Sequence, residues 1–130
     1  MSVYVLVVDD DPDAREVLST LVKMFGRSVK TAASGQEALA QIKSEAPGLI
    51  LLDLMMPQMS GFEVLNRLMA DPEMRRIPVI VVSAYDKAQN GTLQLPGVKE
   101  VLPKGKVNAI AVRALLEKND VGSEPAHLRV

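Results

Sequence analysis

Cysteine is absent from the sequence, and His127 is its one histidine. Without cysteine the chain has no disulfide framework, no thiol nucleophile and no zinc site built on thiolates. A single histidine near the C-terminus also excludes most metal sites and catalytic triads that depend on imidazole. Carboxylates, hydroxyls and ammonium groups remain as the candidates for chemistry.

Aromatic residues and an excess of either charge are also scarce. Aromatics make up 3% of the chain against 48% hydrophobic residues, so the core must be aliphatic. The net charge of -1 at pH 7 gives no reason to expect a nucleic-acid interface or a basic membrane patch. No apolar run is long enough to cross a bilayer, and the N-terminus does not resemble a signal peptide. We therefore expect a cytoplasmic protein.

Short apolar runs alternate with amphipathic stretches along the chain. The runs Val3–Val8, Leu49–Leu54 and Ile77–Val82 are typical of strands that are buried on both faces of a sheet. Ser28–Ala32 and Glu100–Leu102 predict two weaker strands. Strands that alternate with helices indicate a parallel sheet covered on both sides. We predict an α/β fold with a doubly wound, five-stranded parallel sheet.

The amphipathic stretches begin with residues that favour the start of a helix. Asp11-Pro12 combines an N-cap with proline at the first helical position. Ser34 and Ser60 each precede a glutamate by three residues, as in a capping box. Asn108 can cap a last helix that ends near residue 118. These signals predict where the helices enter between the strands.

The length of 130 residues fits one domain with a sizeable core. Glycine and proline in residues 86–97 weaken any helix there. From residue 119 onward the hydrophobic pattern loses its periodicity. We predict one domain over residues 1–118 and a flexible tail over residues 119–130.

Polar side chains lie at the ends of the predicted strands, where ligands bind in open parallel sheets. Asp9 and Asp10 follow the first strand, Asp53 lies near the end of the third, Ser83 follows the fourth, and Lys104 lies after the fifth. We expect three carboxylates, a hydroxyl and an ammonium group to meet at one edge of the domain. Singly, these residues would be a solvated helix start, turn residues and a surface lysine.

Three clustered carboxylates repel one another, so the cluster needs a cation or a proton at neutral pH. Oxygen ligands without thiol or imidazole favour Mg²⁺ or Mn²⁺. A hydroxyl and a lysine beside such an ion suit the oxygens of a phosphoryl group, and a carboxylate there can act as the nucleophile. The pattern predicts in-line phosphoryl transfer to a carboxylate.

At this point the sequence resembles the receiver domain of response regulators, over about residues 3–118. The chemotaxis-regulator-like receivers have a flavodoxin-like fold and act in two-component phosphorelays. The segments that carry the resemblance are Leu6-Val7-Val8-Asp9-Asp10, Leu51-Leu52-Asp53-Leu54-Met55-Met56-Pro57, Ser60-Gly61, Val81-Val82-Ser83-Ala84 and Leu102-Pro103-Lys104.

The resemblance implies a role for each matched residue. Asp53 is the phosphoacceptor, Ser83 hydrogen-bonds the phosphoryl group, and Lys104 pairs with a phosphoryl oxygen. The implied ligands of Mg²⁺ are Asp9, Asp10, Asp53 and the backbone carbonyl of Met55.

The resemblance further implies a function in signalling. A histidine kinase or a histidine phosphotransfer protein would phosphorylate the domain, which would then switch a surface for an unknown downstream protein. A homodimer stays open as a further assembly. The output surface would lie in Tyr85–Lys118 by analogy. The domain would lose its phosphate by slow hydrolysis and would not be a conventional enzyme.

Two positions depart from the family's pattern. Gly105 follows the lysine where the family commonly has proline, and Val101 stands where the family usually has a switch aromatic. These departures leave open a degenerate receiver that acts as a constitutive interaction module. A phosphatase of the haloacid-dehalogenase type would need an acid in place of Met55. A flavin binder would need a phosphate loop where the aspartates stand.

Several methionines and one tyrosine lie near the expected site. Met55 and Tyr85 each lie two positions past a site residue, where bulk should hinder hydrolysing water, so we expect a long-lived phosphorylated state. Core packing is the preferred interpretation of Met56. For Met59 a core position, surface exposure and partner contact stay open.

Overall fold

The computed structural model describes residues 3–84 and 95–119. The described elements, in chain order, are β1 (Tyr4–Val8), α1 (Pro12–Met24), β2 (Ser28–Ala32), α2 (Gly35–Ser44), β3 (Leu49–Leu52), α3 (Gly61–Met69), the 3₁₀ turn η1 (Met74–Arg76), β4 (Val79–Ser83), β5 (Val98–Pro103), the 3₁₀ turn η2 (Lys104–Lys106) and α5 (Ala109–Asn119).

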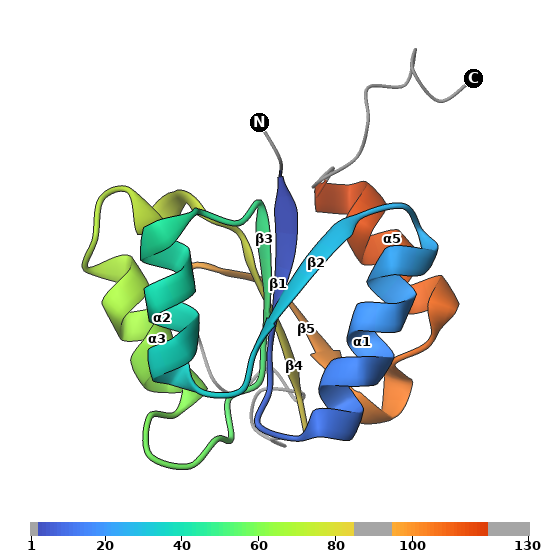
Figure 1. Ribbon diagram of the computed structural model, residues 1–130, viewed down its shortest axis with the longest axis horizontal. Helices are drawn as coiled ribbons and strands as arrows, with labels where there is room; N and C mark the ends of the chain where they lie inside the picture. Colours follow the sequence, from blue (N-terminus) through green and yellow to red (C-terminus); the bar gives the residue numbers. More distant parts are fainter. Residues whose placement is uncertain (1–2, 85–94, 120–130) are drawn as a thin grey trace.

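The five strands form one parallel sheet in the order β2-β1-β3-β4-β5. α2 and α3 cover one face of the sheet, and α1 and α5 cover the other (Figure 1). The strand order reverses between β1 and β3, and in such sheets ligands bind beyond the strand ends at this point. The predicted doubly wound fold is confirmed.

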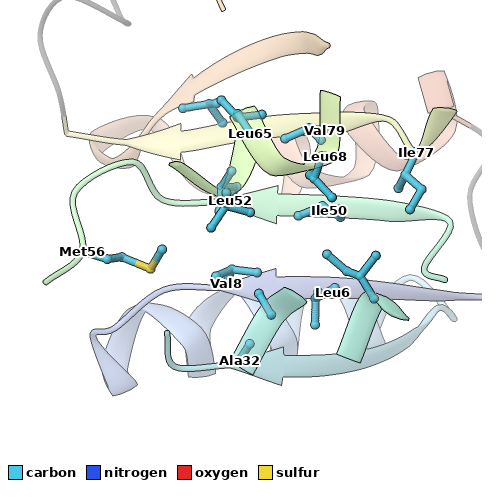
Figure 2. Close-up of a cluster of buried hydrophobic side chains, with 14 of the residues drawn as sticks. Leu6, Val8, Ala32, Ile50, Leu52, Met56, Leu65, Leu68, Ile77 and Val79 are labelled. Carbon is cyan, nitrogen blue, oxygen red and sulfur yellow. The ribbon is translucent and has the colours of Figure 1, made fainter. Parts of the chain in front are cut away.

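Alternate residues of the central strands point to opposite faces, as the two-residue period of a strand requires. Val5 and Val7 pack towards α1 and α5, whereas Leu6 and Val8 pack towards α2 and α3. Figure 2 shows the second of these clusters, with labels on Leu6, Val8, Ala32, Ile50, Leu52, Met56, Leu65, Leu68, Ile77 and Val79. Among the described residues the core is largely aliphatic, and Tyr4 is a buried aromatic exception.

The helix starts agree with the capping residues. Asp11 accepts a hydrogen bond from the backbone N–H of Asp13 at 3.0 Å. Ser34 and Ser60 each accept one from the glutamate three residues on, at 3.1 and 3.3 Å. Asn108 accepts one from the backbone N–H of Ala111 at 2.8 Å. Side chains of these few polar residues therefore set where four helices begin.

Four strands differ from the prediction in their bounds. β1 begins at Tyr4, one residue later than predicted. β3 ends at Leu52, so Asp53 follows the strand. β4 begins at Val79, because the 3₁₀ turn and Pro78 occupy the preceding positions. β5 is longer than predicted and pairs irregularly near Val79 and Ile80. As an edge strand with exposed residues, β5 gives only a weak apolar pattern.

Two predictions fall at the limits of the described chain. Residue 119, assigned above to the tail, is the last residue of α5, and residues 120–130 lie outside the described residues. Of residues 86–97, only 95–97 are described, and they lead into β5. None of the helices described is long and apolar enough to cross a membrane.

Gln58 lies in the loop between β3 and α3 with a φ of 66°, the left-handed region that favours glycine. Gln58→Gly should therefore raise the free energy of unfolding by about 0.5 kcal/mol, since relief of strain exceeds the added entropy of the unfolded chain. Urea unfolding measures this change in the free energy of unfolding, provided that the m-value is the same for the parent and the variant. Gln36→Gly in the exposed first turn of α2 should have the opposite sign, and stabilisation by both variants would contradict the explanation.

Candidate functional site

Asp9 and Asp10 lie directly beyond the carboxyl end of β1. The N–H of Asp9 donates to the carbonyl of Ala32 at 3.2 Å, so Asp9 continues the β1–β2 pairing. Its side chain is 1% exposed, and its Oδ1 accepts a hydrogen bond from the N–H of Asp11 at 3.0 Å. Asp10 is exposed. The start of α1 thus turns one acid inward and leaves the next at the surface.

Asp53 occupies the equivalent place beyond β3. Its N–H donates to the carbonyl of Val8 at 3.0 Å, which ties it to the end of β1. Its side chain is 3% exposed, and its Oδ1 accepts a hydrogen bond from the N–H of Met55 at 3.2 Å. The backbone of two neighbouring strands therefore holds this carboxylate beside Asp9.

The three acids meet as predicted. Asp9, Asp10 and Asp53 each offer a carboxylate oxygen, and these oxygens lie within 4.8 Å of one another. They come from two strands that are adjacent in the sheet but separated by some forty residues of sequence. Separation of Asp53 from the other two would have refuted the predicted cluster, and the fold instead joins them.

Lys104 supplies a cation to the two buried acids. Its Nζ lies 2.9 Å from Asp9 Oδ2 and 3.4 Å from Asp53 Oδ2, and its side chain is 31% exposed. The contact with Asp53 has hydrogen-bond geometry. The contact with Asp9 does not, although it is the shorter of the two, and we treat it as an ion pair without a directed hydrogen bond. The sequence did not predict this pairing with Asp9.

Ser83 is the last residue of β4, is fully buried, and pairs in register with Pro103 of β5. Because β4 lies between β3 and β5, Ser83 ends at the same edge as the acids and Lys104. Met55 follows Asp53 by two residues and its side chain is 57% exposed. The described residues that the sequence assigned to the phosphoryl and metal sites therefore lie at one edge of the sheet.

Burial and like charge dominate the electrostatics of Asp53. Burial, followed by the negative charge of Asp9, raises the pKa of Asp53, and the Met55 N–H and Lys104 only partly oppose this. Burial alone would lower the pKa of Lys104, but its contacts with Asp9 and Asp53 raise the pKa overall. The surroundings therefore disfavour the ionised form of the Asp53 carboxyl and favour the protonated form of the Lys104 amine.

These residues suit a divalent cation. Three carboxylates against one ammonium group leave a formal excess of two negative charges. Asp9 Oδ2 is buried and accepts no hydrogen bond among the described residues. Oxygen donors with excess negative charge are the surroundings that Mg²⁺ and Mn²⁺ prefer. The carboxylates can hold such an ion.

The neighbouring methionines have different surroundings. Met56 is 8% exposed and packs in the core (Figure 2), which confirms its predicted place. Met59 is also 8% exposed and lies against Gly35 at the start of α2, so it is a core residue. Tyr85 lies outside the described residues. Val101, at the position of the family's switch aromatic, is half-buried against the core.

Comparison with known proteins agrees with the fold and shows the family. Residues 5–115 match the response regulator receiver domain family, and the chain belongs to this family. It is 35% identical over 115 residues to the gliding motility regulatory protein of Myxococcus xanthus, covering 88% of this chain and 15% of that protein. It is 39% identical over 105 residues to response regulator MprA of Mycobacterium tuberculosis, covering 80% of this chain and 45% of MprA.

Solved structures show the same architecture. Chemotaxis protein CheY4 of Vibrio cholerae matches with a TM-score of 0.78 and 28% identity, over 91% of this chain and 98% of that one. Response regulator TrrA of Thermotoga maritima, in complex with Mg²⁺-BeF, matches with a TM-score of 0.78 and 28% identity, over 90% and 98%. The chain is thus a receiver domain of two-component signalling, and it spans less than half of the two curated relatives named above.

Proposed function

We propose that this receiver domain accepts a phosphoryl group on the carboxylate of Asp53 in the presence of Mg²⁺ or Mn²⁺. The observation that supports the proposal most is the meeting of three carboxylates within 4.8 Å, two of them buried and paired with Lys104. A constitutive interaction module would have no use for buried acids that repel one another. Their presence at one edge of the sheet favours phosphoryl acceptance.

The site residues would have three different roles, namely binding the cation, attacking phosphorus and binding the phosphoryl oxygens. Asp9, Asp10, Asp53 and the carbonyl of Met55 would hold the cation, which neutralises charge on the incoming phosphoryl group when bound. A carboxylate oxygen of Asp53 attacks phosphorus, the bond to the donor's nitrogen or oxygen breaks, and an acyl phosphate forms. The Lys104 ammonium group and the Ser83 hydroxyl would then bind phosphoryl oxygens. The domain performs this step on itself, and we do not propose a conventional enzyme.

A protein donor would need an accessible surface next to the site, and the surface beside Lys104 is a candidate. A cavity of about 250 Å³ adjoins Lys104, and its wall includes Ala14, Val17 and Leu18 of α1. A histidine kinase or a histidine phosphotransfer protein that delivers a phosphoryl group to Asp53 would cover this rim. We place the reaction in the cytoplasm, where such kinases phosphorylate receivers, with an unknown downstream protein as its target.

The test is incubation with Mg²⁺ and acetyl phosphate, followed by intact-protein mass spectrometry. The parent protein should gain the mass of one phosphoryl group, whereas Asp53→Asn and the chelator-treated parent should gain none. Asp13→Asn is a matched control, because Asp13 lies in the first turn of α1 outside the cluster, and it should be phosphorylated like the parent. No adduct in the parent would favour the interaction module instead.

A further inference from the structure

Gly61, the first residue of α3, is buried against the segment that carries Asp53. Its N–H donates to the carbonyl of Leu54 at 2.9 Å. Ser60 caps the same helix through a hydrogen bond to Glu63 at 3.3 Å. The start of α3 is therefore fixed directly upon the two residues that follow β3.

The approach of Gly61 leaves no room for a side chain. A Cβ on Gly61 would lie 2.2 Å from the carbonyl oxygen of Asp53 and 2.6 Å from the Cα of Leu54. Both atoms belong to the backbone, so neither can turn away as the end of a flexible side chain can. Comparable crowding at Gly35 and Gly97 involves the side chains of Met59 and Met69.

The crowded backbone is the one that aims the Asp53 carboxylate. On one side the Asp53 N–H is bonded to Val8 at 3.0 Å, and on the other its Oδ1 accepts the N–H of Met55 at 3.2 Å. Ordinary van der Waals contact begins near 3.4 Å, so a methyl group at Gly61 would have to displace this backbone or α3 by about an ångström. Displacement there moves the carboxylate relative to Asp9 and Lys104.

We propose that Gly61 is a positioning residue for phosphoryl acceptance, because its missing side chain sets the place of the Asp53 carboxylate among the other acids. The inference rests on the proposed function of Asp53. Misplacement of reacting groups by about 1 Å can cost on the order of 100-fold in rate. Gly61 touches neither the cation nor the phosphoryl group in this proposal, and it acts through the backbone of Asp53.

The test is Gly61→Ala, studied in the full chain. The rate of phosphorylation by acetyl phosphate should fall about 100-fold, and calorimetric titration should show weaker Mg²⁺ binding. Both are measured below the unfolding temperature, with trimethylamine N-oxide added to keep the variant folded. Normal Mg²⁺ affinity and a normal rate in the folded variant would overturn the proposal.

Two control variants separate positioning from loss of stability. Gly97→Ala is also destabilising, since Gly97 has a φ of 81° and its Cβ would meet Met69, but it lies at the start of β5 away from the acids. Ser60→Ala removes the cap of α3 and adds no atom against Asp53, at a cost of about 1 kcal/mol. Both should keep the rate and the Mg²⁺ affinity within about twofold of the parent.

The outcomes are distinct from those that test the proposed function. If Ser60→Ala slows phosphorylation as much as Gly61→Ala, or if Gly97→Ala does so, general loosening explains the loss and the positioning role is refuted. The comparison is made only between samples whose circular dichroism matches that of the folded parent, so that loss of folding is not counted as loss of positioning. If the parent itself takes up no phosphoryl group, the proposed function of Asp53 fails instead.

Discussion

Replacement of Lys104 by glutamine should slow phosphorylation by acetyl phosphate about 100-fold without weakening the binding of Mg²⁺. The ammonium group lies 2.9 Å from Asp9 and 3.4 Å from Asp53, so it occupies the space between the buried carboxylates. Removing one positive donor from a charged phosphoryl group typically costs two to three orders of magnitude in rate. The same change removes a competitor for Asp9, and the cation should bind at least as tightly.

Stopped-flow measurement of the rate at saturating Mg²⁺, with calorimetry for the affinity, checks both parts. Lys106→Gln is the matched control, because Lys106 lies in the same 3₁₀ turn and its loss changes the net charge equally. It should alter the rate and the affinity by less than about twofold. A Lys104 variant whose Mg²⁺ affinity falls in step with its rate would show that the lysine merely supports the metal site.

Replacement of Asp53 by asparagine should stabilise the metal-free protein at neutral pH by roughly 2–5 °C in melting temperature. Burial, followed by the charge of Asp9, raises the pKa of Asp53 in the folded state above its ordinary value of 3.8. The folded protein therefore binds this proton more readily than the unfolded chain does, and the ionised carboxylate lowers stability at pH 7. Asparagine has no charge to bury.

The difference in stability between the parent and Asp53→Asn should depend on pH. As pH falls through the raised pKa of Asp53, the folded parent takes up the proton and recovers stability relative to the variant. Below 3.8 both states of the parent are protonated, and this difference disappears. Melting curves at pH 7 and at stepwise lower pH measure it.

The stability test includes a control variant, Asp13→Asn, and melting curves with added Mg²⁺. Asp13→Asn should lower the melting temperature slightly, since Asp13 lies in the first turn of α1 and favours the helix dipole. Mg²⁺ should stabilise the parent, by about 1.4 kcal/mol at ten times its dissociation constant, and should stabilise Asp53→Asn less. A metal-free Asp53→Asn protein less stable than the parent at pH 7 would contradict the electrostatic account.

The sequence predicted the central part of the fold because its signals there are strong and local. The runs that form β1 and β3 are buried along their whole length, and the acids at their ends follow a rule that holds for parallel sheets in general. Asp11, Ser34 and Ser60 predicted helix starts through hydrogen bonds that span only two or three residues.

The sequence did not predict features that depend on contacts between residues far apart in the chain. The length of β5 depends on its pairing with β4, and its residues are mostly only partly buried, so they give no clear apolar pattern. The ion pair of Lys104 with Asp9 joins residues that lie far apart in the sequence, and no local pattern indicates it. Gly61 belongs to a segment that resembles the family. Its close approach to the backbone of Asp53, however, depends on how α3 packs against the end of β3, which the sequence does not show.

The most direct measurement is the chemical identity of residue 53 after reaction. The protein is incubated with acetyl phosphate and Mg²⁺, treated with borohydride, digested and sequenced by mass spectrometry. Hydride reduces an acyl phosphate to the alcohol with release of phosphate, so the account predicts homoserine at position 53, present only when the divalent ion was supplied. Homoserine at another aspartate, or equal conversion of Asp53 in the presence of chelator, would contradict it.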